Sequence, residues 1–355
     1  MKLSQECILL QNELRKFSQQ ILADKVDELD KACNFPMDNI KRLADMGIIG
    51  ALVPESYGGA GLDTVGFAVV LEEIAKVCAS TAFVVASHNV FFAYPILKSG
   101  SEEMKKKYLS AAAAGKMVGA FALPRANELD VEGGPDRPTV SGRNPFVLNA
   151  TAGGPVIAAF PAHGSSDPIL CVIDPDTPGC TFKGPSKTIG LRAAGIGEYH
   201  FDKCKPPAGN ITGAKVESMF DCGRILLGAI SVGIGQGACD SAIKYAKERI
   251  QFGQPITEFG MVREQIADML VSIESARHMV HDAALRMDRG EDFRVAAAMA
   301  KLVAGRAATA TTTAAIQVYG GYGYMKDYPA ERFFRDAQML NVICSTPDED
   351  KEIIA

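Results

Sequence analysis

The distribution of proline divides this chain into three parts more clearly than any other feature of its sequence. Twelve of the 18 prolines fall between Pro124 and Pro207, whereas the 73 residues from Ile256 to Tyr328 contain none. Proline costs about 3 kcal/mol inside an α-helix, because it lacks an N–H donor and clashes with the preceding turn. Long proline-free tracts can therefore be helical, and the dense middle cluster cannot.

The hydrophobic patterns agree with that division. Near the start, Ile8, Leu14, Phe17 and Ile21 recur at helical spacing. In the middle, short apolar runs such as 169–173 lie between Gly, Pro and Asp turns, which is typical of β-strands. Alanine-rich amphipathic segments return towards the C-terminus. We predict a helical domain over residues 1–118, a β domain over 119–215 and a helical bundle over 216–355.

The composition excludes several classes of protein. Apolar residues make up 47%, charged residues 22% and the net charge is −5, without a Lys/Arg-rich tract that would attract nucleic acid or an anionic membrane. No apolar run reaches the roughly 18 residues of a membrane span, and no charged-then-apolar leader opens the chain. Nine scattered cysteines without a CxxC motif indicate neither a disulfide framework nor a zinc site. We therefore expect a cytoplasmic protein without a membrane, nucleic-acid or metal partner.

Motifs that occur in a fixed order cover most of the chain. LVPESYGGAG stands at 52–61, three shorter landmarks stand at 174–179, 187–192 and 207–213, and RIQFGQPI at 249–256 precedes QIADM at 265–269. The stretch 317–337 reads QVYGGYGYMKDYPAERFFRDA. Together they resemble the acyl-CoA dehydrogenase family nearly end to end. The resemblance implies an all-α N-terminal domain, a middle β-barrel or β-sandwich domain and a C-terminal four-helix bundle.

The resemblance also implies a reaction and a cofactor. In that family a carboxylate removes a proton from Cα of an acyl-CoA thioester, and a hydride passes from Cβ to FAD. Each FAD is shared: the middle domain of one subunit holds the isoalloxazine ring, and a second subunit contacts the diphosphate and adenine. FAD, acyl-CoA and a neighbouring subunit are thus the expected ligands and partner.

The base of that reaction is missing at both positions where the family carries it. The usual glutamate position is Cys344, and the position used by other members is Gly223. A thiol needs a cationic neighbour to ionise, and none is adjacent to Cys344 in the sequence. We therefore interpret Cys344 as a small buried residue and assign no catalytic residue.

The other charged candidates near these positions carry no assigned chemistry. Arg224, next to Gly223, is either structural or substrate-facing. The remaining side chains are expected to have solvated or helix-terminal places rather than catalytic or metal-binding roles; they are Asp221, His278, His281, Asp348, Glu349 and Asp350.

The two middle-domain segments that bind flavin in the family are altered. The first, usually Phe-x-x-Thr-Glu-Pro, reads FALPRANELD at 121–130, so Pro124 removes a hydroxyl and an N–H donor. Glu128 and Asp130 are expected to bring negative charge towards the diphosphate. The second, usually Asn-Gly-x-Lys-x-Trp-Ile-Thr, reads NATAGGPV at 149–156, with Gly154 in place of the aromatic residue and Val156 in place of the threonine.

The half of the site that reaches into a neighbour is retained. Arg249 stands where the family arginine contacts the neighbour's diphosphate, a role suited to its rigid charged guanidinium. The resemblance assigns further cofactor contacts to residues of the same motifs, namely Gln251, Phe252, Gln317, Gly320, Gly321 and Thr346. Gln251 replaces a more usual Thr or Ser.

These observations favour one hypothesis and leave two alternatives open. The favoured one is a subunit of a heterotetrameric acyl-CoA dehydrogenase that lacks its own base and flavin-binding segments but donates FAD contacts to a homologous catalytic subunit. An electron-transferring flavoprotein is a further candidate partner. The alternatives are an active homotetrameric FAD-dependent dehydrogenase with an unusual base, and a non-redox acyl-CoA enzyme or binding protein on the same fold.

Overall fold

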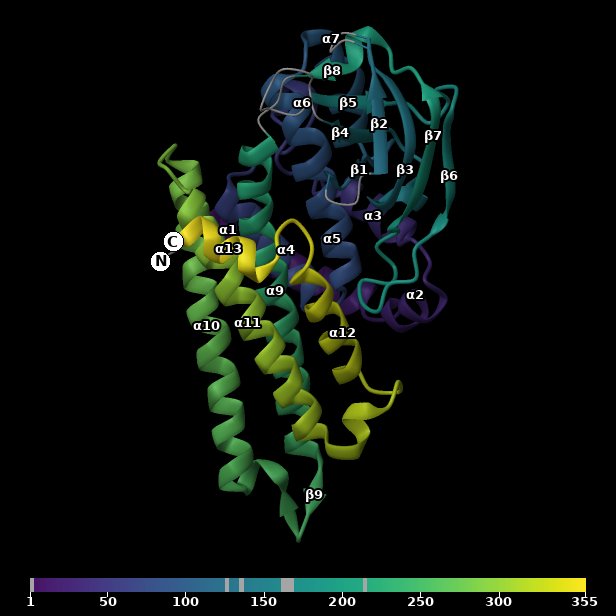
Figure 1. The fold of residues 1–355 in the computed structure, drawn as a ribbon. Helices are drawn as coiled ribbons and strands as arrows, with labels where there is room; N and C mark the ends of the chain where they lie inside the picture. Colours follow the sequence, from purple (N-terminus) through teal and green to yellow (C-terminus); the bar gives the residue numbers. More distant parts are fainter. Residues whose placement is uncertain (1–2, 125–127, 134–136, 161–168, 213–215) are drawn as a thin grey trace.

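The computed structural model describes residues 3–124, 128–133, 137–160, 169–212 and 216–355. Arg125 to Asn127 of the first flavin motif and Gly213 of a middle-domain landmark lie outside these ranges. Helices precede the sheet and follow it, so the expected three-part architecture is confirmed (Figure 1). We keep residues 118 and 215 as proposed domain boundaries, because α8 ends before the first and α9 begins directly after the second.

The N-terminal part consists of short helical segments around the buried helices α4 and α5. Asp63 caps α4 by accepting a hydrogen bond from the N–H of Gly66 at 2.7 Å, which satisfies one of the free donors of the first turn. Every residue of α4 and α5 is buried. The segments are α1 (Gln5–Phe17), η1 (Ser18–Leu22), α2 (Val26–Ala32), α3 (Met37–Asp45), η2 (Glu55–Tyr57), α4 (Thr64–Ala75), α5 (Ala79–Ser87), η3 (His88–Ala93), α6 (Tyr94–Ser99), α7 (Glu102–Met104), η4 (Lys105–Leu109) and α8 (Ser110–Ala113).

The middle part is one eight-stranded sheet with the order β6-β7-β3-β1-β4-β5-β8, and β2 pairs with β3 off this path. All pairs on it are antiparallel except β1 with β4. One face packs around a small core that includes Val140, Val147, Cys171 and Tyr199. The strands are β1 (Ala120–Ala122), β2 (Glu128–Glu132), β3 (Thr139–Leu148), β4 (Val156–Phe160), β5 (Ile169–Ile173), β6 (Cys180–Pro185), β7 (Gly197–Cys204) and β8 (Ile211–Thr212), with 3-10 turns η6 (Ala150–Ala152) and η7 (Ala208–Asn210).

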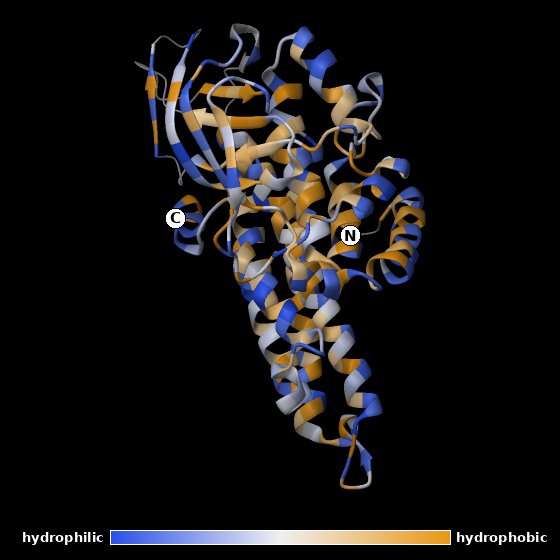
Figure 2. Cartoon of the chain, turned by 90° about the vertical axis from the view of Figure 1, so that its right-hand side faces the viewer, coloured by the Kyte–Doolittle hydropathy of each residue, from blue (hydrophilic) through white to orange (hydrophobic). Residues whose placement is uncertain are grey.

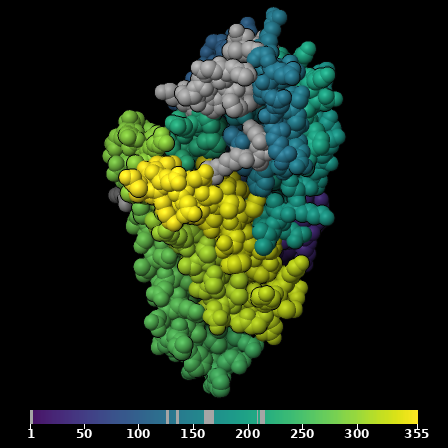
Figure 3. All heavy atoms as spheres, viewed as in Figure 1, coloured from purple at the N-terminus to yellow at the C-terminus, as the bar shows by residue number. Residues whose placement is uncertain are grey.

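The C-terminal part is a helical bundle built on α9, a helix of 33 residues. Figure 2 shows hydrophobic residues where the helices face one another, and Figure 3 shows the C-terminal segment on the surface between the bundle and the sheet. The elements are α9 (Val216–Glu248), β9 (Ile250–Gln251), β10 (Gln254–Pro255), η8 (Ile256–Glu258), α10 (Gly260–Asp288), α11 (Arg294–Tyr319), η9 (Gly320–Tyr324), α12 (Ala330–Leu340) and α13 (Pro347–Ile354).

Two helical stretches, Ala79–Ser99 and Val216–Glu248, are long and apolar enough to span a membrane, which the sequence did not lead us to expect. Their apolar windows are 89% and 94% buried inside the protein. Because core helices of this length carry the same composition, packing within the fold explains both stretches.

One expected surface residue is buried and joins two of the three parts. His281 of α10 is 7% exposed, and its Nε2 lies 2.7 Å from Oε1 of Glu72 on α4, whose other oxygen accepts from Arg277 at 2.8 Å. The expectation of a solvated histidine at this position was wrong, because the sequence does not show the acidic partner from another helix. His278 is exposed as expected, and the described residues contain no group of metal-ligating side chains.

A second buried histidine fixes the helical domain against the sheet. His88 Nδ1 accepts a hydrogen bond from the N–H of Gly119 at 3.0 Å, and Nε2 lies 3.3 Å from the carbonyl oxygen of Ala112. This pattern holds the imidazole in its neutral form with the proton on Nε2. Burial lowers the pKa of His88 from 6.5 to about 4.

We predict that His88 makes stability depend on pH. Between about pH 6.5 and 4 the unfolded chain binds a proton that the folded chain excludes, so the free energy of unfolding falls as pH falls through this window, by about 3 kcal/mol in all. Glutamine does not titrate, so His88→Gln lacks this pH-dependent loss. As the pH falls from 7 to 5, the free energy of unfolding of the variant should therefore rise relative to that of the parent. Urea unfolding at both pH values measures the difference. His278→Gln is the control, and equal pH slopes for His88→Gln and the parent would contradict the prediction.

Candidate functional site

Four of the residues predicted to contact a neighbour's cofactor line one cavity at the far end of the bundle. Arg249, Gln251, Gly320 and Gly321 surround a space of 530 Å³ together with Tyr245, Ile256, Val318, Tyr319, Tyr322 and Met325. A Cβ atom added at Gly320 or Gly321 would meet nothing within 4 Å, and Gly320 has φ +60°. The backbone is therefore open to close approach by a ligand.

Stacked tyrosines lie beside this cavity, which the sequence reasoning missed. The Tyr245 and Tyr319 rings stack at 4.2 Å, Tyr328 packs edge-on against both, and the Arg249 guanidinium lies 5.6 Å from the Tyr322 ring centre. Among the described residues, no carboxylate pairs with Arg249 within 4 Å. The signal was present: Tyr245 precedes Arg249 by four residues, one helical turn, and the motif at 317–324 contains three tyrosines.

Phe252 is 92% exposed at the tip of the β9–β10 hairpin. It has φ +51° and is followed by Gly253 at φ +81°, a left-handed pair typical of a tight hairpin turn. A large apolar residue is strained in that conformation, and its exposed ring contributes no hydrophobic stabilisation. Gln317 is exposed on the last turn of α11, and its contact with a cofactor stays a prediction.

This end of the molecule is remote from the chain's own sheet. Figures 1 and 2 both show the β9 hairpin at the end of the bundle opposite the β domain. Gly223 and Arg249 are 26 positions apart, a span of about 39 Å along α9 and the residue after it at 1.5 Å per residue. Arg249 therefore cannot reach a ligand bound beside Gly223 of the same chain.

The two expected base positions lie together. A Cβ atom added at Gly223 would lie 3.1 Å from Cys344 Sγ and 2.9 Å from Cζ of Phe91. Cys344 is 4% exposed, in agreement with its interpretation as a buried residue, and its thiol donates to the carbonyl oxygen of Phe220 at 3.3 Å. Neither position carries a carboxylate.

Aromatic rings occupy the space next to these positions. Phe91, Phe121 and Phe220, here called the Phe91 cluster, have ring centres 5.2 to 6.2 Å apart. Phe91 and Phe121 are each 1% exposed. A base at residue 223 or 344 needs the α-carbon of a substrate within hydrogen-bond reach. The ring of Phe91 lies beside residue 223, where the α-carbon of a substrate would have to approach such a base.

The charged groups around Cys344 form a buried structural network. Arg224 Nε donates to Asp350 at 3.0 Å and its Nη1 to Asp221 at 2.7 Å, while Lys301 Nζ donates to the carbonyl oxygen of Ser345 at 2.6 Å and contacts Asp350 at 3.4 Å. Burial lowers the pKa of Lys301 despite the opposing charge of Asp350. Arg224 is thus engaged structurally.

One sequence expectation about this region needs correction. Asp350 is fully buried rather than solvated, because α13 folds back onto Arg224 and Lys301. Asp221 lies near the N-terminus of α9, as expected, where it is buried beside Arg224. Asp348 is exposed as expected. Thr346 caps α13 in a reciprocal capping box with Glu349, which occupies its hydroxyl, and its assignment to the cofactor stays a prediction.

The first flavin motif ends in a strand rather than in a phosphate-binding loop. Residues 128–132 form β2, whose exposed Glu128 is held by Arg143 of β3 at 2.6 and 3.1 Å. Asp130 also faces solvent on this strand. Arg143 neutralises the charge that Glu128 was expected to bring towards the diphosphate, so the expectation needs correction for Glu128, whereas for Asp130 it stays a prediction. In the described part of this motif, residues 121–122 lie in β1 and residues 128–130 lie in β2.

The second flavin motif leaves no space for an aromatic wall. Asn149 is buried and donates to Gly119 O at 3.1 Å, and Val156 already lies in β4 with its side chain buried in the sheet core. A Cβ atom at Gly154 would lie 2.0 Å from the carbonyl oxygen of Val118, so no larger residue fits there. The described residues of these two motifs provide neither the threonine hydroxyl nor the aromatic ring that the resemblance implies beside the isoalloxazine. The bundle-end cavity, with a cation, aromatic faces and open glycines, fits a diphosphate and adenine.

Comparison with known proteins agrees with these features. The family models of the acyl-CoA dehydrogenase N-terminal and C-terminal domains match residues 4–116 and 214–346. The chain is 34% identical to the probable acyl-CoA dehydrogenase YngJ of Bacillus subtilis (strain 168), over 100% of this chain and 98% of that protein.

Two solved structures are similar over the whole fold. One is butyryl-CoA dehydrogenase from Megasphaera elsdenii, with a TM-score of 0.93 and 30% identity. The other is a chain in the structure of the electron transferring flavoprotein of Acidaminococcus fermentans, described in connection with flavin-based electron bifurcation, with a TM-score of 0.95 and 31% identity. Each likeness covers 100% of this chain and 98% of the other. The chain belongs to the FAD-dependent acyl-CoA dehydrogenase family.

Proposed function

We propose that this chain is a half-site subunit of a heteromeric acyl-CoA dehydrogenase. It contributes Arg249, Gln251, Phe252 and the glycine turn at 320–321, with Gln317, to FAD that is bound mainly by a homologous catalytic subunit. When bound, FAD supplies the hydride acceptor for dehydrogenation of the acyl-CoA. The chain itself supplies neither the base nor the surface for the isoalloxazine ring.

The contrast between the two half-sites carries this proposal. At the bundle end, stacked tyrosines and a cation that has no carboxylate partner within 4 Å among the described residues line a cavity, and a 92% exposed phenylalanine lies at the tip of the adjacent hairpin. Beside the sheet, Gly154 packs against Val118 where the family carries an aromatic residue, and the Phe91 cluster lies next to the two positions that lack a base. Loss of one half with retention of the other supports division of labour between two subunits.

The comparisons support the choice of partners. The Megasphaera relative is a butyryl-CoA dehydrogenase, so an acyl-CoA is the proposed substrate of the complex. The Acidaminococcus structure contains an electron transferring flavoprotein, which we propose as the class of electron acceptor. We propose a heterotetramer with fewer flavins than chains.

Coexpression with a catalytic acyl-CoA dehydrogenase subunit from the same source tests the proposal. We expect the chain purified alone to be colourless and the copurified complex to be yellow, with fewer FAD molecules than chains, and to bleach on addition of acyl-CoA. A yellow chain with one FAD of its own that bleaches with acyl-CoA would establish the active homotetramer instead. A chain that is colourless under all conditions and still binds acyl-CoA would support the non-redox alternative.

Substitution of Arg249 is expected to weaken FAD binding by the complex. A hydrogen bond from a charged group contributes about 1.5–3 kcal/mol, so Arg249→Gln should lower the affinity for FAD roughly tenfold to a hundredfold. Arg249→Lys keeps the charge but loses the paired donors and should give an intermediate loss. The FAD released on dialysis is measured. Arg289→Gln is the control, because Arg289 follows the end of α10 that is remote from the β9–β10 hairpin. Full retention of FAD in Arg249→Gln would contradict the proposed contact.

The proposal also predicts that Cys344 has no catalytic role. Cys344→Ala should leave kcat of the complex unchanged within about twofold, whereas loss of a general base lowers rates by about 10²-fold or more. The pH profile of the complex should also be unchanged. A large loss of kcat in Cys344→Ala would identify the thiol as an unusual base and favour the homotetrameric alternative.

A further inference from the structure

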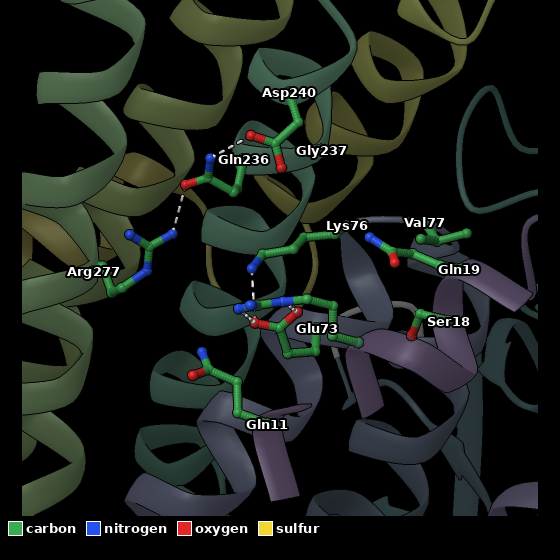
Figure 4. A pocket seen from close by; sticks show the side chains of 11 residues that line it. Gln11, Ser18, Gln19, Glu73, Lys76, Val77, Gln236, Gly237, Asp240 and Arg277 are labelled. Atoms are coloured by element: carbon green, nitrogen blue, oxygen red, sulfur yellow. Dashed lines mark hydrogen bonds and ion pairs between the residues drawn. The ribbon is translucent and has the colours of Figure 1, made fainter. Parts of the chain in front are cut away.

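A second cavity lies where the N-terminal helices meet the bundle, far from the residues assigned above. It measures 620 Å³, within the size range of small-molecule sites. Figure 4 shows its lining side chains converging from α1 and η1, from α4 and the turn after it, and from α9 and α10. They are Gln11, Arg15, Ser18, Gln19, Glu73, Lys76, Val77, Gln236, Gly237, Asp240 and Arg277.

A buried ion cluster forms one side of this cavity. The Glu73 side chain is 1% exposed, and it accepts from Lys76 Nζ at 2.7 Å and from Arg15 Nη2 and Nε at 3.1 and 3.3 Å. Burial opposes ionisation of Glu73, but the two cations outweigh it and hold the pKa of the carboxyl below its ordinary value. One carboxylate thus faces two cations, and this side of the cavity has an excess of positive charge.

Several donors on this side remain unused. Arg15 directs Nε and Nη2 to Glu73, and no hydrogen bond among the described residues uses its Nη1. Lys76 Nζ has three protons and donates one hydrogen bond in the described structure. The hydroxyl of Ser18, a residue that is 1% exposed, has no hydrogen-bond partner among the described residues. A buried polar group without a partner costs free energy, so the Ser18 hydroxyl points to a missing acceptor. The remaining donors of Arg15, whose side chain is 46% exposed, and of Lys76 belong to the same cavity and are available to the same acceptor.

The local backbone supports the same interpretation. Ser18 begins η1, a π-helical segment that interrupts the end of α1 and places Ser18 and Gln19 on the cavity. Such segments are frequent at functional sites. On the facing wall, α9 approaches so closely that a Cβ at Gly237 would lie 2.2 Å from the carbonyl oxygen of Lys76. This close packing fixes the wall that α9 and the turn after α4 form together.

The opposite wall has a different character. Each of the three guanidinium nitrogens of Arg277 already donates a hydrogen bond, to Glu72, Glu274 and Gln236 respectively. Gln236 in turn donates to Oδ1 of Asp240 at 2.8 Å, which leaves Oδ2 of this exposed carboxylate as an acceptor. A ligand that spans the cavity meets donors at Arg15, Lys76 and Ser18, and an acceptor at Asp240.

We propose that this cavity binds a small organic anion that also carries a hydrogen-bond donor. A phosphate or carboxylate group would accept from Arg15 Nη1, Lys76 and Ser18, and a hydroxyl or ammonium group on the same molecule would donate to Asp240. The site is independent of the proposed FAD contacts, because no residue is shared between the two cavities.

Three probes that differ in one group each test this assignment. In a phosphate-free buffer of low ionic strength, thermal unfolding and titration calorimetry are recorded with O-phosphoethanolamine, inorganic phosphate and ethanolamine. We expect O-phosphoethanolamine to raise Tm most, phosphate less and ethanolamine not at all. The measurement needs neither flavin nor acyl-CoA, so its outcome is separate from that of the proposed function. No effect of either phosphate compound, or an equal effect of ethanolamine, would overturn the assignment.

A matched pair of variants distinguishes a binding role of Ser18 from a structural one. Ser18→Ala should raise Tm without probe, because it removes a buried hydroxyl that lacks a partner, and should weaken O-phosphoethanolamine binding at least about tenfold. Thr311→Val removes another buried hydroxyl without a partner, on α11 and outside the cavity, and should raise Tm without changing probe affinity. Equal probe affinity in Ser18→Ala and the parent would contradict the role of Ser18 in the site.

Discussion

The close packing of α4 on α9 is the constraint on which the rest of the structure depends. A Cβ atom at Gly233 would lie 2.6 Å from the carbonyl oxygen of Glu72, and one at Gly237 would lie 2.2 Å from that of Lys76. Only glycine permits this approach. It joins the N-terminal helices to the bundle and leaves α9 as one continuous rod, with Gly223 near its beginning and Arg249 just after its end.

That rod explains why the two halves of the cofactor site can change independently. Residues near Gly223 pack against the sheet, the Phe91 cluster and Cys344, whereas Arg249 and the hairpin project from the opposite end of the bundle. Residues more than about 10 Å apart without shared partners contribute to stability almost additively. Closing one end therefore has little energetic effect on the other, and a subunit can lose its own flavin surface while keeping the contacts it offers to a neighbour.

Much of the fold could be read from the sequence, because its signals are local. Proline excludes helix wherever it clusters, and the motif order identified the architecture. The misses share a different cause. His281 and Asp350 are buried because partners arrive from distant parts of the chain, Glu72 for one and Arg224 and Lys301 for the other. Neither partnership leaves a spacing pattern. Glu128 was misjudged because β2 forms only through pairing with β3, which also brings Arg143.

The packing beside Cys344 stabilises the isolated chain, whereas the exposed Phe252 at the other end of the bundle does not. This contrast bears on the proposed division of labour. An empty cavity beside Cys344 would forfeit packing, and large side chains such as Phe91 recover it, so a chain that holds no flavin gains stability by closing that space. Phe252 shows the reverse. Its ring is 92% exposed in a left-handed conformation, and neither property stabilises the isolated chain. A residue that the free subunit has no energetic reason to display is explained by a complex that buries it, whether the neighbour is another copy of this chain or the homologous subunit that we propose.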